Sequence, residues 1–199
     1  RAYSETWLYT MNGREPRKRI SLNGNTLTVR VMNMYCSEIY QVCFQTYIDL
    51  YTILPDNYKI ARAREVMEYE MSTPNHDYWW WSDGLYMVMP VMTKLYKVTG
   101  NHLYLDKLYE YIVYSDSIML DRETGLYYRD AKYVYPKHKT SSGKKDFWAR
   151  GDGWVLAGLA KVLKDLPADY EHRSFFRKQV CETGRSSRSH PATGRLLDP

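Results

Sequence analysis

Two tryptophan-rich stretches place charged side chains among flat apolar rings. In the first, three consecutive tryptophans at 79–81 are followed, after one serine, by Asp83. In the second, Arg150 stands between Trp148 and Trp154. Indole rings offer stacking faces together with a polar N–H edge, a combination that suits carbohydrate clefts. The two stretches together therefore predict a pocket that contains a carboxyl group and a guanidinium.

Asp83 allows two interpretations. As the N-cap of a helix, its side chain would accept backbone N–H bonds, its pKa would fall, and its role would be structural, worth about 1 kcal/mol. As a catalytic acid it would be shielded by the indoles, which disfavour the charged form and raise the pKa toward neutrality. The neighbouring tryptophans favour the acid, because a simple cap does not need them.

Arg150 and Trp154 lie four residues apart and share one face if a helix has begun there. A guanidinium in this place can bind a carboxylate through two parallel hydrogen bonds, and a structural salt bridge is the alternative. Asp152, between two glycines, is interpreted as a helix cap rather than as a chemical group.

Two further residues are weighed against structural alternatives. His76, in the loop before the tryptophans, is a candidate for substrate binding, with a solvated loop residue as the alternative. Asp130 is a second candidate carboxylate, with a turn-stabilising aspartate as the alternative. The five histidines show neither HxxxH nor HExxH spacing, so no metal site is predicted. The sequence also has no Walker or dinucleotide motif, so no cofactor is expected.

Apolar residues recur at three- and four-residue steps and predict a chain built mainly of helices. The expected helices span residues 26–53, 56–72, 82–98, 102–119, 153–166 and 170–182. Alternation within 126–135 predicts a short β-hairpin, which is followed by a basic loop at 137–145. Residues 1–25 are expected to be loop with a short helix around Trp7, and residues 184–199 show no periodic apolar face.

The helix ends show an internal repeat of similar helix–turn–helix units. Tyr51 and Tyr96 occupy equivalent places 45 residues apart, and a third unit follows after the hairpin. Helix pairs at this period form either an open solenoid or a closed α/α toroid. The toroid is favoured, because both tryptophan-rich stretches precede a helix of the inner type and would meet at one mouth.

Composition narrows the class of partner. The chain has 20 Tyr, 6 Trp and a formal charge of +5, which is spread widely and suits an acidic oligosaccharide better than a nucleic acid. Cys36, Cys43 and Cys181 are expected to be buried thiols, since their spacing gives neither a disulfide framework nor a zinc site. No apolar run approaches the roughly 18 residues of a membrane span. No signal peptide is visible, but the chain starts at Arg1 without Met, so a bacterial cytoplasmic or periplasmic location stays open.

Both tryptophan-rich stretches match motifs of a known family. Residues 81–90 (WSDGLYMVMP) resemble the W-x-D-A-L-F-M segment of the unsaturated rhamnogalacturonyl hydrolases, glycoside hydrolase family 105, which are related to the family 88 unsaturated glucuronyl hydrolases. Residues 147–154 (FWARGDGW) are similar to their F-W-x-R-G-N-G-W. The separation of 67 residues between Asp83 and Arg150 also fits. With QTYIDLY at 45–51 and KLYKVTG at 94–100, the likeness covers about residues 45 to 180.

The resemblance implies a fold and a mechanism. The fold would be an all-α toroid of six helical hairpins without metal, in which residues 1–199 form a single, incomplete catalytic domain. Asp83 would protonate C4 of the C4=C5 double bond in a terminal unsaturated uronic acid and activate the water that adds at C5. The hemiketal would then open and release the neighbouring sugar, as a glycosidase of pectin-derived rhamnogalacturonan oligosaccharides does. Arg150 would hold the acidic sugar, Trp81 and Trp154 would form ring walls, and Trp148 and His76 are added as substrate-binding candidates.

The sequence departs from the family pattern in three places. The family has an A-D-D type segment before its Q-T-Y-x-D-L-Y helix, where Met34–Tyr40 contains Glu38 but no aspartate. Asp152 stands where asparagine is usual, and the family's W-R-x-S-L-L-D-P segment is reduced near residues 189–199. About seven helices cannot close a ring of twelve, which indicates a partial chain. Two alternatives therefore stay open: an inactive sugar-binding relative, and a noncatalytic TPR-like helical-repeat module that binds peptides.

Overall fold

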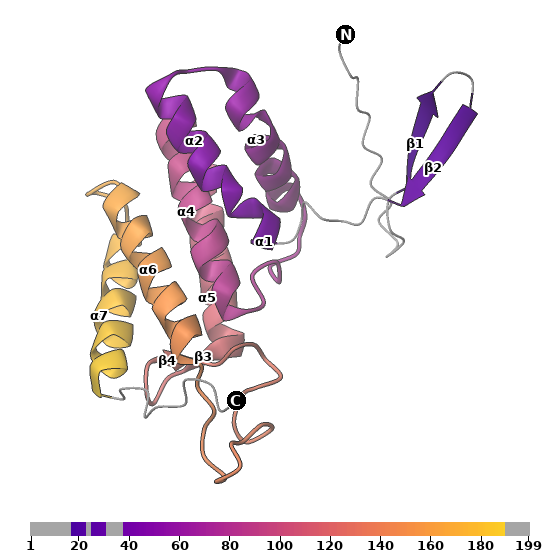
Figure 1. Cartoon of the computed structure of the whole chain (residues 1–199). Coiled ribbons are helices and arrows are strands. Elements are labelled where there is room, and N and C mark those ends of the chain that lie inside the picture. The colour runs from indigo at the N-terminus through magenta and orange to yellow at the C-terminus, as the bar shows by residue number, and fades with distance from the viewer. Residues whose placement is uncertain (1–16, 23–24, 31–37, 190–199) are drawn as a thin grey trace.

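The computed structural model describes residues 17–22, 25–30 and 38–189, and they are predominantly helical (Figure 1). The helices are α1 Glu38–Gln41, α2 Cys43–Ile53, α3 Asn57–Ser72, α4 Ser82–Thr99, α5 Leu103–Met119, α6 Ala149–Asp165 and α7 Arg173–Ser189. The strands form two antiparallel pairs, β1 Arg17–Leu22 with β2 Asn25–Arg30 and β3 Leu120–Asp121 with β4 Leu126–Tyr127.

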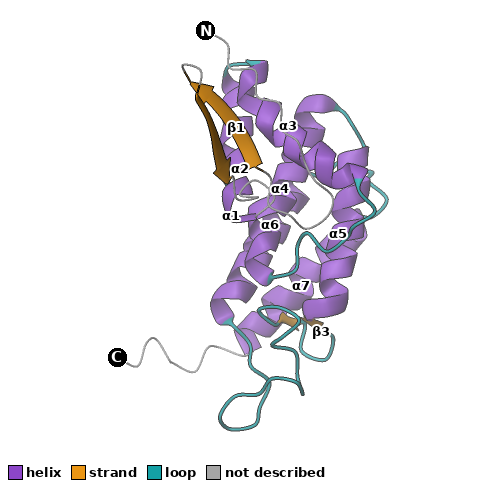
Figure 2. Cartoon of the chain, turned by 90° about the vertical axis from the view of Figure 1, so that its right-hand side faces the viewer, coloured by secondary structure: helices purple, strands orange, loops and turns teal. Residues whose placement is uncertain are grey.

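The long helices of the described residues form the helical hairpins α2–α3, α4–α5 and α6–α7. Helices α2 and α6 both pack on α4, while α3, α5 and α7 each pack on the helix that precedes them. The result is an inner row of α2, α4 and α6 with an outer partner for each (Figure 1). Because successive helices run in opposite directions, the N-terminal ends of α4 and α6 lie at the same end of the row. The loops around β3 and β4 gather at that end (Figure 2).

Helix α4 is the centre of the core. Leu85, Met89, Met92 and Leu95 are fully buried along its length, and each side chain of this kind stabilises the fold by roughly 1.5–3 kcal/mol. The helix ends at Gly100, whose φ of 71° is left-handed, so the predicted closing glycine is present. The first turn of this helix, which contains Asp83, is buried as well.

Gly158 lies where α6 meets α4. A Cβ at this position would stand 3.0 Å from Leu85 O, Tyr86 Cα and Met89 Cε. Two of these atoms belong to backbone, so an alanine would force the helices apart, and we expect Gly158→Ala to lower the free energy of unfolding by about 1–3 kcal/mol. Urea unfolding measures this change. Gly153→Ala is the matched control, because nothing lies within 4 Å of its Cβ, and it should stabilise by up to about 1 kcal/mol. Equal effects of the two variants would contradict the prediction.

The predicted helix at 26–53 is wrong in its first part. Residues 25–30 form β2, which pairs with β1 in an antiparallel hairpin, and the first long helix begins only at Cys43. The segment Asn-Thr-Leu-Thr-Val-Arg contains three β-branched residues, which favour strands. The predicted loop at 1–25 likewise contains β1, and the expected helix around Trp7 lies outside the described residues.

Other boundaries also differ from the prediction. Helix α6 begins at Ala149 rather than 153, because the Arg-Gly-Asp-Gly segment joins its first turn. Helix α7 spans Arg173–Ser189 and so continues into a stretch without a periodic apolar face. The hairpin expected at 126–135 is formed instead by β3 and β4, with Gly125 at a φ of 72° in the turn between them.

The cysteine prediction is also corrected. Cys43 and Cys181 are both exposed rather than buried. Cys36 lies outside the described residues. In the part of the chain that the structure describes, no helix is long and apolar enough to span a membrane.

Candidate active site

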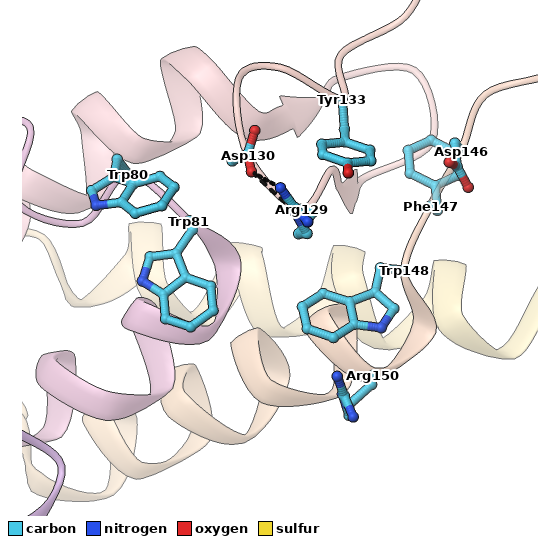
Figure 3. Close-up of a pocket in the computed structure, with 9 residues that line it drawn as sticks. All are labelled: Trp80, Trp81, Arg129, Asp130, Tyr133, Asp146, Phe147, Trp148 and Arg150. Carbon is cyan, nitrogen blue, oxygen red and sulfur yellow. Dashed lines mark hydrogen bonds and ion pairs between the residues drawn. The ribbon is translucent and has the colours of Figure 1, made fainter. Parts of the chain in front are cut away.

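A pocket of about 570 Å³ lies between the N-terminal ends of α4 and α6 and the loop that follows β4 (Figure 3). Its aromatic walls are Trp80, Trp81, Tyr133, Phe147 and Trp148. Its charged side chains are Arg129, Asp130, Asp146 and Arg150. Its size falls within the range of about 300–1,000 Å³ that is usual for small-ligand sites. The structure thus brings the two tryptophan-rich stretches together in one pocket, as their composition predicted.

The three consecutive tryptophans have different roles. Trp79 is fully buried in the core, where its ring meets Tyr111 edge-on at 5.2 Å between centroids. Trp80 and Trp81 line the pocket and stack on each other, with centroids 5.9 Å apart and ring planes 26° apart. Trp80 is 49% exposed, so it offers an open face at the pocket. Only two of the three indoles therefore form the flat wall that the sequence suggested.

Asp83 lies in the first turn of α4 but does not cap it. Trp81 holds the N-cap position, and no side chain caps the helix there. Asp83 as a whole is 8% exposed and does not itself line the pocket, and its Oδ1 accepts no hydrogen bond from the described residues. Burial raises the pKa of Asp83, and the positive charge of Arg150 offsets part of that rise. This environment favours the neutral carboxyl, which is the state that the acid interpretation requires.

The start of α4 holds a cluster of unpaired polar atoms. Trp81 Nε1, Ser82 Oγ and Asp83 Oδ1 are buried, and none has a hydrogen-bond partner among the described residues. Each such atom costs about 1–3 kcal/mol, and native proteins contain few of them. Three such atoms in consecutive residues single out this turn within the described part of the chain.

Arg150 lies in the first turn of α6 and stacks on Trp148, with its guanidinium carbon 4.5 Å from the ring centroid. It is exposed and makes no ion pair with any described residue, so the structural salt bridge considered for it is not observed there. The next residue, Gly151, brings α6 close to α4. A Cβ on it would stand 2.6 Å from Ser82 Oγ and 2.9 Å from Trp148 Cε3. This close approach places Arg150 near enough to Asp83 to act on its pKa.

Arg129 is a pocket residue that sequence reasoning missed. Its Nε and Nη2 both donate to Asp130 Oδ2, at 3.0 and 2.9 Å, and its guanidinium carbon lies 4.0 Å from the ring centroid of Tyr133. Asp130 Oδ1 accepts the backbone N–H of Lys132 at 2.8 Å, which is the turn-stabilising role considered for that aspartate. The one signal in the sequence is the position of Arg129 inside an aromatic segment with the pattern of a hairpin.

The loop after β4 is joined to α4 through the backbone. Trp81 and Asp130 form an antiparallel β-bridge, and the N–H of Ser82 donates to the carbonyl of Arg129 at 2.9 Å. This pairing sets the distance between the Trp80–Trp81 wall and the Arg129 wall independently of their side chains.

A buried polar network joins β4 to the helices α5, α6 and α7. Tyr127, fully buried in β4, donates its hydroxyl to Asp116 Oδ1 at 2.6 Å and its N–H to Asp152 Oδ1 at 2.7 Å. Gln179 of α7 donates to the other oxygen of Asp116. Asp152 is therefore not a helix cap, because Trp148 holds the N-cap of α6, and the carboxyl of Asp152 ties that helix to β4 instead.

Two carboxyl groups in this network have raised pKa values. Burial raises the pKa of Asp152 to about 7, although the Tyr127 N–H works in the opposite direction. Burial also raises the pKa of Asp116 to about 6, against the lowering effects of Tyr127, Arg122 and Gln179. Both carboxyl groups are therefore expected to change protonation near neutral pH.

The structure does not bring two of the expected residues into the pocket. His76 is exposed and pairs with Glu110 of α5. Trp154, in the second turn of α6, packs on Tyr86 with ring centroids 4.4 Å apart and does not line the pocket. The family's aspartates would stand within residues 34–40, of which 34–37 lie outside the described residues. In the described ranges, no three His, Cys, Asp or Glu side chains form a group that could hold a metal.

Comparison with known proteins identifies relatives of the whole helical body. The family model described as Glycosyl Hydrolase Family 88 matches residues 17–185. A solved structure described as a polysaccharide lyase is 67% identical and superposes with a TM-score of 0.77 over 78% of this chain and 44% of that one. A glycosyl hydrolase family 88 structure from Bacteroides vulgatus is 60% identical, with a TM-score of 0.76 over 77% of this chain and 44% of that one.

More distant relatives agree with the resemblance seen in the motifs. The unsaturated 3S-rhamnoglycuronyl hydrolase of Formosa agariphila is 40% identical over 102 residues, which are 49% of this chain and 27% of that protein. A family 105 glycoside hydrolase of C. acetobutylicum, 20% identical, has a TM-score of 0.59 over 81% of this chain and 49% of that one, which shows a shared fold. The predicted fold class, an α/α toroid, is confirmed. The chain spans less than half the length of each of these relatives.

Proposed function

Because the chain belongs to glycosyl hydrolase family 88, we propose that it forms part of the active site of a hydrolase that removes a terminal unsaturated uronic acid from an oligosaccharide. The observation that supports this most is Asp83: a buried carboxyl with a raised pKa, beside a guanidinium, at the edge of an aromatic pocket. Membership of this family does not favour the TPR-like binding module, whose tyrosine-rich groove would serve peptides.

In the proposed reaction, the carboxyl group of Asp83 acts first as a general acid and then as a general base. Neutral Asp83 gives its proton to C4 of the C4=C5 double bond, and positive charge develops at C5, next to the ring oxygen. The resulting carboxylate takes a proton from the water that adds at C5, which returns Asp83 to its neutral form. The C5 hemiketal then opens by breaking the bond between C5 and the ring oxygen, which gives a ketone at C5 and leaves C1 as a hemiacetal. C1 becomes an aldehyde as the hemiacetal releases the neighbouring sugar with its hydroxyl group. A carboxyl with a raised pKa suits both steps, because it must exchange protons near the working pH.

Arg150 is proposed to bind the carboxylate of the uronate. It already stacks on Trp148, makes no ion pair with a described residue, and lines the pocket. The positive charge of Arg150 lowers the pKa of Asp83. When the carboxylate of the substrate pairs with Arg150, this lowering effect becomes weaker. Substrate binding would then raise the pKa of Asp83 further and keep the acid protonated when C4 is in place.

Substitution of Arg150 tests this assignment. We expect Arg150→Met to raise KM for an unsaturated disaccharide roughly 10- to 100-fold, the usual value of a lost hydrogen-bonded charge pair. The pH dependence of kcat/KM should also shift upward, because the pKa of Asp83 rises when the guanidinium is gone. Arg177→Met removes the same charge from the exposed side of α7 and should change neither quantity. A KM that is unaltered in Arg150→Met would contradict the role.

The reaction is tested by following the ultraviolet absorbance of the C4=C5 double bond in an unsaturated disaccharide. The hydrolase proposal expects the absorbance to fall. A relative that is 67% identical is described as a polysaccharide lyase, so β-elimination is the second candidate reaction. A lyase would create the double bond, and the absorbance of an intact polysaccharide would then rise. Binding of the disaccharide without any change in absorbance would indicate an inactive sugar-binding relative.

The substrate is further defined by the identity of the sugar that is bonded to the unsaturated uronate. The motifs resemble enzymes of pectin-derived rhamnogalacturonan fragments, in which rhamnose follows the uronate. The relative from Formosa agariphila is named for a 3S-rhamnoglycuronyl substrate. We propose an acidic oligosaccharide of one of these two kinds, and hydrolysis rates on both substrates would separate them.

A further inference from the structure

We infer that Arg129 binds a second anionic group, located on the sugar next to the unsaturated uronate. The inference rests on the proposed function, in which Arg150 is occupied by the carboxylate of the uronate itself. Arg129 and Arg150 line the same pocket but come from different elements, the loop after β4 and the first turn of α6 (Figure 3). A ligand with one negative charge needs only one of them.

The guanidinium of Arg129 has hydrogen-bond donors to spare. Nε and Nη2 donate to a single oxygen of Asp130, at 3.0 and 2.9 Å. A guanidinium has five N–H groups in a rigid fork, so an edge with three of them is left for another acceptor. The side chain of Arg129 is 43% exposed, whereas that of Asp130 is 3% exposed. Asp130 therefore lies behind the arginine, and the open part of the guanidinium is the part available to a ligand.

The position of Arg129 is fixed before any ligand arrives. Its guanidinium lies over the ring of Tyr133 at 4.0 Å, and its own carbonyl accepts the N–H of Ser82 at 2.9 Å. Asp130 is held in turn by the N–H of Lys132. A guanidinium that is already held in place loses little freedom on binding an anion, which improves affinity and makes the geometry selective.

The acidic side chains of the pocket already have partners. Asp130 is satisfied by Arg129, and Asp146 Oδ2 pairs with His138 Nε2 at 2.7 Å. The positive charge of Arg129 opposes the negative charge of the Asp130 carboxylate, and His138 occupies one oxygen of Asp146. The alternative is that Arg129 serves only to neutralise buried Asp130, in which case its removal would not distinguish one ligand from another.

The experiment compares three unsaturated uronyl disaccharides whose second sugar has a sulfate ester, a carboxylate or no charge. Affinities are measured by titration calorimetry in an Asp83→Asn background, so that no ligand is consumed. Arg129→Met combined with Asp130→Asn removes the ion pair without leaving a buried charge, and the new amide oxygen can still accept the Lys132 N–H. Arg177→Met is the control for the loss of one positive charge. Thermal unfolding of each variant checks that the fold is retained.

We expect the background protein to bind a disaccharide with a charged second sugar roughly 10- to 100-fold more tightly than the neutral one. The double variant should lose this preference and still bind the neutral disaccharide within about twofold. Which charged ligand binds better identifies sulfate or carboxylate as the preferred group. Equal affinities for all three ligands, or an equal loss for all three in the double variant, would overturn the inference alone. Failure to bind any of the disaccharides would overturn the proposed function as well.

Discussion

Asp83→Asn is expected to lower kcat on an unsaturated disaccharide by about 10³- to 10⁴-fold, with little change in affinity. A general acid contributes about 10²- to 10⁴-fold, and here one carboxyl supplies both the acid and the base. Asparagine has the same shape but can neither give a proton to C4 nor take one from water. Initial rates of absorbance loss measure kcat, and titration calorimetry measures the affinity.

Two features make this result specific. Asp77→Asn is the matched control, because Asp77 is exposed in the loop before α4, and it should leave kcat unchanged. The folded protein raises the pKa of Asp83, so its ionised form is less favourable in the folded state than in the unfolded state. Asp83→Asn should therefore be at least as stable as the parent above neutral pH. An Asp83→Asn variant as fast as the parent, or one inactive because it is unfolded, would contradict the proposal.

Asp152→Asn is expected to stabilise the protein at alkaline pH by as much as about 4 kcal/mol. Folding raises the pKa of Asp152 from its ordinary value of 3.8 to about 7, and each pKa unit corresponds to about 1.4 kcal/mol. Asparagine mimics the neutral carboxyl and keeps an oxygen that can accept the N–H of Tyr127. The variant is more stable because it has no carboxylate at position 152 that must be ionised while buried.

The sign of the pH effect follows from linkage. A carboxyl whose folded pKa lies above its unfolded pKa contributes its full stability below pH 3.8 and loses it as the pH rises through about 7. The parent should therefore unfold more easily at pH 8 than at pH 5, and Asp152→Asn should reduce that difference. Asp116, with a pKa of about 6, leaves a smaller residual dependence of the same sign.

Urea unfolding at pH 5 and pH 8 measures these differences, with Asp169→Asn as the control because Asp169 is exposed. A stability difference between the two pH values that is the same in the parent and in Asp152→Asn would show that Asp152 is not the group that titrates.

Helical periodicity predicts most of the inner row and its outer partners. The helix that begins at Ser82 and ends at Gly100 is predicted almost to the residue, because a glycine with left-handed backbone closes it. The strand β2 is wrongly predicted as helix, because its threonines and valine fit a helical spacing as well as an alternating one. Register between β3 and β4 depends on a turn at Gly125 rather than on alternation, so the predicted hairpin lies too late in the chain.

The candidate site is predictable only in part. Asp83, Trp81, Trp148 and Arg150 stand in recognisable motifs, and the structure gathers them at adjacent helix ends. Arg129 cannot be found by spacing, because its place beside the pocket depends on a backbone bridge between the loop and Trp81. Asp152 stands in the motif, but its burial against Tyr127 comes from tertiary packing and cannot be read from neighbouring residues.

The bridge between Trp81 and Asp130 has a consequence for how such a pocket can diversify. Two of its walls are held together by main-chain bonds, which every amino acid except proline can supply. Side chains such as Trp80 and Arg129 can therefore be exchanged by mutation while the frame that presents them keeps its dimensions. Descendants of one ancestral gene could acquire new sugar preferences in single steps, without first rebuilding the scaffold.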